Sequence, residues 1–91
     1  MNKFNLQKCI DECVCHEFTG NCKKGGGYFK LTVCPSIQKS GCFDLFKTSL
    51  SDDINDLCDI NQLCGISKLE MEQKLDEKFE FVSNIGCHDC P

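Results

Sequence analysis

The clearest hydrophobic pattern in the chain lies near its C-terminal end, where apolar residues recur every three or four positions. Ser67-Lys68-Leu69-Glu70 opens this segment as a capping box, with Ser67 at the N-cap and Glu70 three residues later. Charged residues occupy the positions between the apolar ones, as on the outer face of an amphipathic helix. The pattern predicts a helix from about Lys68 to Ser83. Its apolar stripe consists of Met71, Leu75, Phe79, Val82 and Ile85.

Weaker patterns predict further short helices in the preceding part of the chain. Apolar residues and cysteines follow one another at helical spacing from Asn5 to His16. A helical turn is expected at residues 43–46, which follow Ser40-Gly41. Another helix is expected from Ser51, a favourable N-cap residue, to Cys64, with Gly65 in the C′ position.

One segment alternates with a period of two instead. Phe29, Leu31 and Val33 share one side of the stretch 28–33, which Cys34-Pro35 ends, so this stretch predicts a short extended segment. No second strand is evident to pair with it. The predicted fold is therefore a mainly α, disulfide-rich bundle of three to four short helices in a single domain spanning residues 1–91.

The cysteine content changes the picture of how such a fold is stabilised. Ten of the 91 residues are cysteine, and a chain this short has little apolar surface to bury, so cross-links are expected to replace a large core. An even, dense set of cysteines is typical of a disulfide framework. We expect five disulfides, with connectivity left open, among Cys9, Cys13, Cys15, Cys22, Cys34, Cys42, Cys58, Cys64, Cys87 and Cys90.

Disulfides persist in oxidising compartments, so the chain is expected to be secreted. No signal-peptide pattern follows Met1, and we interpret the chain as one from which a signal has been removed. The formal net charge is −4 and the sequence contains no arginine, which disfavours nucleic acid as a partner. No segment has the length and apolarity of a transmembrane helix.

The alternative to a disulfide framework is a metal site in an intracellular protein. Cys13-x-Cys15-His16 near one end and Cys87-His88-x-Cys90 near the other combine thiolate and imidazole, the ligands that zinc prefers. Four of these six residues would suffice for one zinc ion and would join the two ends of the chain. This alternative describes a zinc-binding adaptor; the disulfide interpretation needs no metal and no cofactor.

Catalysis finds little support. No combination of nucleophile, base and oxyanion donors can be assembled, so we expect no enzyme activity, and a small secreted hydrolase is a less favoured alternative. Cys58-x5-Cys64-Gly65 resembles the closing cysteine pair of saposin-like proteins, a family of helical, disulfide-linked lipid binders. The resemblance covers about seven residues, and the family's opening Cys-x2-Cys is replaced by Cys9-x3-Cys13. A saposin-like lipid binder is therefore also less favoured.

The remaining interpretation is a secreted binding protein, a toxin-, pheromone- or effector-like ligand of a receptor or host target. A rigid scaffold of this kind presents loops, and the loop around Gly25-Gly26-Gly27 combines lysines with aromatic residues. Lys23, Lys24, Tyr28 and Phe29 are the predicted contact residues, although Phe29 is at least as well explained as a core residue. The sequence contains no information on the partner's identity or on the oligomeric state.

Overall fold

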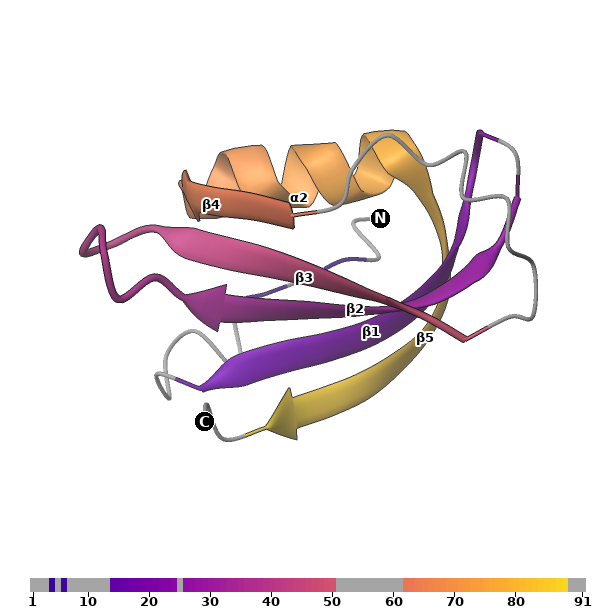
Figure 1. The fold of residues 1–91 in the computed structure, drawn as a ribbon, viewed down its shortest axis with the longest axis horizontal. Coiled ribbons are helices and arrows are strands. Elements are labelled where there is room, and N and C mark those ends of the chain that lie inside the picture. The colour runs from indigo at the N-terminus through magenta and orange to yellow at the C-terminus, as the bar shows by residue number, and fades with distance from the viewer. Residues whose placement is uncertain (1–3, 5, 7–13, 25, 51–61, 89–91) are drawn as a thin grey trace.

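The computed structural model describes Phe4, Leu6 and residues 14–24, 26–50 and 62–88. Five strands in this part of the chain form one antiparallel sheet in the order β4-β3-β2-β1-β5 (Figure 1). One helix, α2, lies between β4 and β5 in the sequence. The elements are β1 (Cys15–Cys22), β2 (Tyr28–Pro35), β3 (Phe43–Ser49), β4 (Gln62–Ile66), α2 (Lys68–Lys78) and β5 (Phe79–His88).

The prediction of a mainly α-helical bundle is wrong, because most of the described chain is β-sheet. The segment 28–33 is extended, as predicted, and it forms most of β2, whose partners are β1 and β3. His16 lies in β1, residues 43–46 lie in β3, and residues 62–64 lie in β4, although each of these was expected in a helix. Residues 7–13 and 51–61, the main parts of two predicted helices, lie outside the described residues.

The predicted C-terminal helix exists but is shorter than expected. Its start is confirmed: Ser67 has extended backbone angles, and its side chain accepts a hydrogen bond from the Glu70 N–H at 3.3 Å. The helix ends at Lys78, and the next residue, Phe79, is already extended and pairs with Cys22 of β1. Pairing with β1 therefore replaces the last turns of the predicted helix with a strand.

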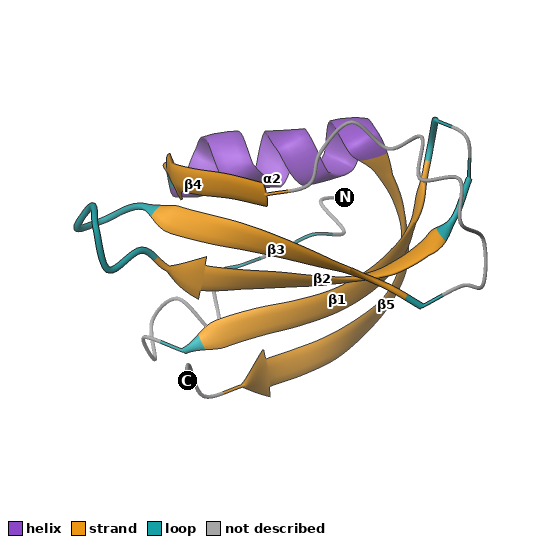
Figure 2. Cartoon of the chain, viewed as in Figure 1, coloured by secondary structure: helices purple, strands orange, loops and turns teal. Residues whose placement is uncertain are grey.

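One face of the sheet packs against α2, and this layer contains the core (Figure 2). Alternate residues of the central strands point into it, and the buried face of α2 supplies Met71 and Leu75. Phe4 joins from the N-terminal part, with its ring centroid 5.3 Å from those of Phe18 and Phe81 in edge-to-face contacts. The other fully buried or nearly buried members include Leu6, Phe29, Leu31, Val33, Phe43, Leu45 and Phe79.

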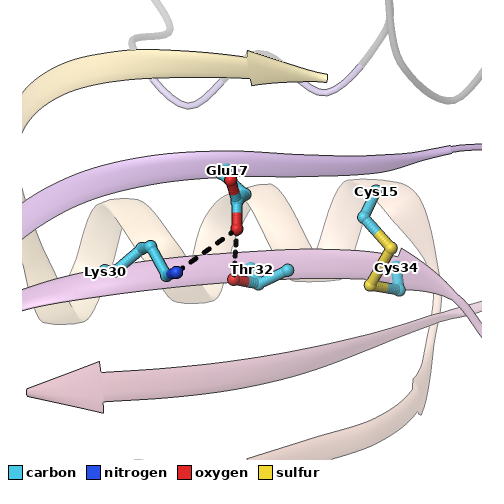
Figure 3. Close-up of a disulfide and its surroundings, with 5 residues drawn as sticks. All are labelled: Cys15, Glu17, Lys30, Thr32 and Cys34. Atoms are coloured by element: carbon cyan, nitrogen blue, oxygen red, sulfur yellow. Dashed lines mark hydrogen bonds and ion pairs between the residues drawn. A yellow bond between two sulfur atoms is a disulfide. The ribbon is translucent and has the colours of Figure 1, made fainter. Parts of the chain in front are cut away.

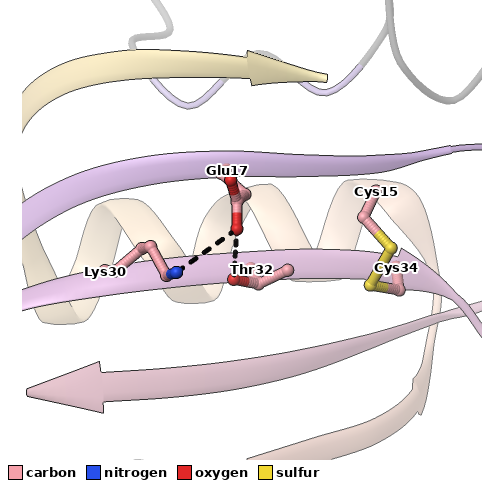
Figure 4. Close-up of polar contacts among 5 residues, drawn as sticks. All are labelled: Cys15, Glu17, Lys30, Thr32 and Cys34. Carbon is pink, nitrogen blue, oxygen red and sulfur yellow. Dashed lines mark hydrogen bonds and ion pairs between the residues drawn. A yellow bond between two sulfur atoms is a disulfide. The ribbon is translucent and has the colours of Figure 1, made fainter. Parts of the chain in front are cut away.

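The opposite face of the sheet carries polar side chains. Glu17 lies between its two neighbours on β2, with one carboxylate oxygen 3.6 Å from Lys30 Nζ and 3.5 Å from Thr32 Oγ1 (Figure 4). α2 lies behind the sheet in this view, so these three side chains point away from the core. A partly exposed ion pair of this kind contributes only about 0–1 kcal/mol, so this cluster adds little to the stability of the fold.

The edge strand β5 contains two irregularities in its pairing with β1. Register shifts occur between Glu17 and Phe18 and between Thr19 and Gly20, which leaves Ile85 and Val82 without a directly opposite residue. Both side chains are exposed, at 52% and 46%. Bulges of this kind bend an edge strand and interrupt its row of backbone groups, which protects it from pairing with other chains. They also explain why the last two members of the predicted apolar stripe are not buried.

Candidate binding surface

The predicted binding loop connects β1 to β2, and its first lysine is tied to the rest of the fold. The Lys23 N–H donates to the Lys78 carbonyl at 2.9 Å, and Lys23 Nζ donates to the Asp76 carbonyl at 2.7 Å. The same ammonium lies 3.9 Å from a carboxylate oxygen of Glu80. Lys23 therefore fastens the loop to the end of α2 and the start of β5. Both Lys23 and Lys24 are exposed.

The aromatic pair of this loop is divided between core and surface. Phe29 is only 3% exposed and is a core residue, whereas Tyr28 is half-buried. Gly27 has a φ of +99°, and a Cβ on it would lie 2.9 Å from a ring carbon of Phe29, so this close approach requires glycine. Lys47 Nζ lies 4.6 Å from the Phe29 ring centroid. Binding through residues 23–29 stays a prediction. Lys23 and Lys24 are exposed and Tyr28 is half-buried, so these three residues are accessible to a partner.

A disulfide joins Cys15 to Cys34, with a Cα–Cα distance of 4.2 Å (Figure 3). The two residues are directly opposite each other at the adjoining ends of β1 and β2, which follows from the pairing of His16 with Val33. Cys22 and Cys87 are also disulfide-bonded. Two of the proposed zinc ligands, Cys15 and Cys87, are thus engaged as half-cystines and carry no thiolate for a metal.

His16, another proposed zinc ligand, is buried in the sheet. It is 4% exposed, its ring stacks on Phe18 with centroids 4.0 Å apart, and its Nε2–H donates to Asn84 Oδ1 at 2.6 Å. Its Nδ1 is buried and accepts no hydrogen bond from the described residues. His16 therefore acts as a packed core residue. His88 ends β5 opposite Cys15, and Cys13 and Cys90 lie outside the described residues.

The cysteines do not all follow the predicted pattern of five disulfides. Cys42, half-buried just before β3, is a free thiol in this structure and departs from that pattern. Cys64 is exposed on β4. Cys9 and Cys58 lie outside the described residues, like Cys13 and Cys90.

The loop from Ser36 to Cys42, which joins β2 to β3, is closed by four hydrogen bonds. Ser36 Oγ accepts from the N–H groups of Gln38 and Lys39, at 3.3 and 3.2 Å. The Ser36 N–H donates to the Cys42 carbonyl at 2.9 Å, and the Cys42 N–H donates to the Lys39 carbonyl at 3.1 Å. These bonds hold the backbone in a compact turn, so the loop has a defined shape.

Ile37 projects from this loop with 97% of its surface exposed, more than any other large apolar residue in the described chain. A single exposed apolar residue is common on proteins, but this one occupies the tip of a braced turn. We did not single it out from the sequence. The available signal is an isolated isoleucine within a run of turn-forming and polar residues, Pro35-Ser36-Ile37-Gln38-Lys39-Ser40-Gly41.

No protein-family model, no curated protein and no solved structure matches this chain. Within the described part of the chain, no helix has the length and apolarity needed to cross a membrane.

Proposed function

We propose that this chain is a secreted, cysteine-rich binding protein, a toxin-, pheromone- or effector-like ligand, that recognises a receptor or host protein through the loop 36–42. The observation that carries the proposal is the exposure of Ile37, at 97%, on a loop that four hydrogen bonds close. An apolar side chain on a hydrogen-bonded loop suits insertion into a pocket of a partner, because the loop backbone loses little conformational entropy when it binds.

The shape of the loop favours this mode of recognition over the addition of a strand to a partner's sheet. Ser36 Oγ bonds to the N–H groups of the second and third residues after it, and the Cys42 N–H bonds back to Lys39. The backbone therefore turns at this point. An extended segment is needed for adding a strand to a partner's sheet. A compact turn instead presents projecting side chains, which can enter a pocket of the partner.

Secretion is supported by the disulfides. Cys15 and Cys34 are bonded, and Cys22 and Cys87 are half-cystines as well. Structural disulfides are rare in reducing compartments, where a cysteine-rich protein more often binds metal. The intracellular zinc adaptor would need Cys15 or Cys87 as a thiolate in most of its ligand combinations, so the disulfides count against it.

The test is a binding screen of the oxidised, fluorescently labelled protein against an array of extracellular receptor domains. Ile37→Asp is compared with Leu50→Asp, a matched control, because Leu50 is also an exposed apolar residue, at 48%, and follows the opposite end of β3. We expect Ile37→Asp to weaken the dissociation constant by at least about tenfold, as for an anchor residue, and Leu50→Asp to leave it within about twofold. Circular dichroism checks that both variants fold.

Two results would contradict the proposal. If the protein binds saturably but Lys24→Glu and Leu50→Asp weaken binding while Ile37→Asp does not, recognition occurs at the other end of the sheet. If the wild-type protein binds none of the domains saturably, a role as a receptor ligand is wrong.

A further inference from the structure

Two of the most exposed apolar side chains lie at the same end of the molecule. The loop 36–42 and the first turn of α2 both occupy one end of the long axis (Figure 1). Leu69, in that first turn, is 67% exposed, and Ile37 is 97% exposed. Two contacts connect the segments: Phe43, next to the loop, pairs with Ile66, and the Lys39 side chain packs against Gly65.

Lys39 adds a positive charge to this end. Its Cδ lies 3.4 Å from the position that a Cβ on Gly65 would occupy, so its aliphatic part covers the backbone of β4. Lys39 is nonetheless exposed, and none of the described carboxylates forms an ion pair with it. The stem is thus held in place while the ammonium group remains available to a carboxylate of another molecule.

We infer that Ile37, Lys39 and Leu69 form one interface, and that its partner is a protein with an apolar depression bordered by carboxylates. This inference rests on the proposed function and specifies the chemistry of the partner. The molecule measures 25 × 24 Å across its long axis, so the whole end fits within the roughly 800 Å² that one partner typically covers. A partner that receives Ile37 therefore also reaches Leu69.

A membrane is the other surface that attracts apolar residues and lysines together, and the charge of this chain argues against it. Each lysine near an anionic surface contributes only about 1 kcal/mol, and the chain as a whole carries a net charge of −4. Two apolar side chains with Lys39 and Lys68 are too little for stable attachment, and the exposed Glu70 beside Leu69 is repelled by an anionic surface. Directed contact between Lys39 and a carboxylate of a protein pocket needs only one positive charge.

The experiment uses the receptor domain that binds in the array, with vesicles of phosphatidylcholine and phosphatidylserine at 4:1 as a second probe. Leu69→Asp is compared with Leu50→Asp, the same change at the opposite end of the sheet. Lys39→Met is compared with Lys74→Met, the same change in the middle of α2, away from both candidate surfaces. Lys39→Met keeps the packing on Gly65 and removes only the charge. An aspartate at position 69 favours the N-terminus of α2, so this variant is expected to fold.

We expect Leu69→Asp to weaken binding to the receptor domain by at least about tenfold and Lys39→Met by about threefold to tenfold, with smaller salt dependence for Lys39→Met than for wild type. The two control variants should stay within about twofold of wild type. If Ile37→Asp abolishes binding while Leu69→Asp and Lys39→Met do not, the proposed function stands but this extended, acidic-partner interface is wrong. Saturable binding to the vesicles that Lys39→Met abolishes would also overturn the inference, because the partner would then be a membrane.

Discussion

At the scale of single residues, His16 shows how a polar ring is accommodated in a sheet core. Its Nε2–H donates to Asn84 Oδ1 at 2.6 Å, its ring stacks on Phe18, and its Nδ1 has no partner among the described residues. The hydrogen bond to Asn84 is therefore the one that satisfies a ring nitrogen of His16 among the described residues. The zinc alternative included His16 because Cys13 and Cys15 lie close to it in the sequence. Neither its burial nor a partner 68 residues away can be deduced from such a local pattern.

Replacing Asn84 tests this role. Asn84→Ala leaves both nitrogens of the buried His16 ring without a protein partner, so we expect the free energy of unfolding in urea to fall by about 1–3 kcal/mol. In the double variant His16→Phe/Asn84→Ala, an apolar ring of similar shape needs no partner, and most of the lost stability should return. Equal stability of Asn84→Ala and the double variant would show that the hydrogen bond is not what holds the ring in place.

At the scale of elements, α2 is the part of the fold that local sequence determines best. Ser67, the capping contact to Glu70 and the buried residues Met71 and Leu75 all follow the predicted pattern. The prediction extended the helix too far because Phe79, Val82 and Ile85 continue the helical spacing. The same stretch also suits a strand, since phenylalanine, valine and isoleucine favour β-structure, and pairing with β1 decides between them.

The start of α2 gives a prediction at this scale. Ser67→Ala removes the side-chain oxygen that accepts from the Glu70 N–H, and we expect it to lower the free energy of unfolding by about 1 kcal/mol. Ser40→Ala, at an exposed position in the loop 36–42, is the matched control and should change it by no more than about 0.5 kcal/mol. Urea unfolding followed by circular dichroism measures both. Equal shifts of the two midpoints would mean that Ser67 has no capping role.

At the scale of the whole molecule, the fold class could not be predicted because its stabilising contacts are distant in sequence. β1 lies between β2 and β5, and the pairing of Cys15 with His88 joins the start of the first strand to the end of the last one. Only Tyr28–Pro35 shows the alternation of a strand clearly, whereas β3 contains Phe43, Leu45 and Phe46, which fit a helical turn as well. The candidate surface at Ile37 was missed for a related reason: exposure depends on how the neighbouring strands fold around a loop.

The disulfide between the ends of β1 and β2 can be tested at the same scale. Cys15 and Cys34 are 19 residues apart, and opening a loop of this length costs about 3 kcal/mol of stability in the chain-entropy description. We therefore expect Cys15→Ala/Cys34→Ala to lower the free energy of unfolding in urea by about 3 kcal/mol, and by somewhat more because Cys15 is fully buried.

Cys42→Ala is the control: it removes a half-buried thiol that closes no loop, and we expect a loss of at most about 1 kcal/mol. If both variants lose the same stability, the bond between β1 and β2 does not support the sheet. Since the loop 36–42 follows directly after Cys34 and Pro35, the sheet end that presents Ile37 would then be held by strand pairing and by the packing of Val33 and Phe43.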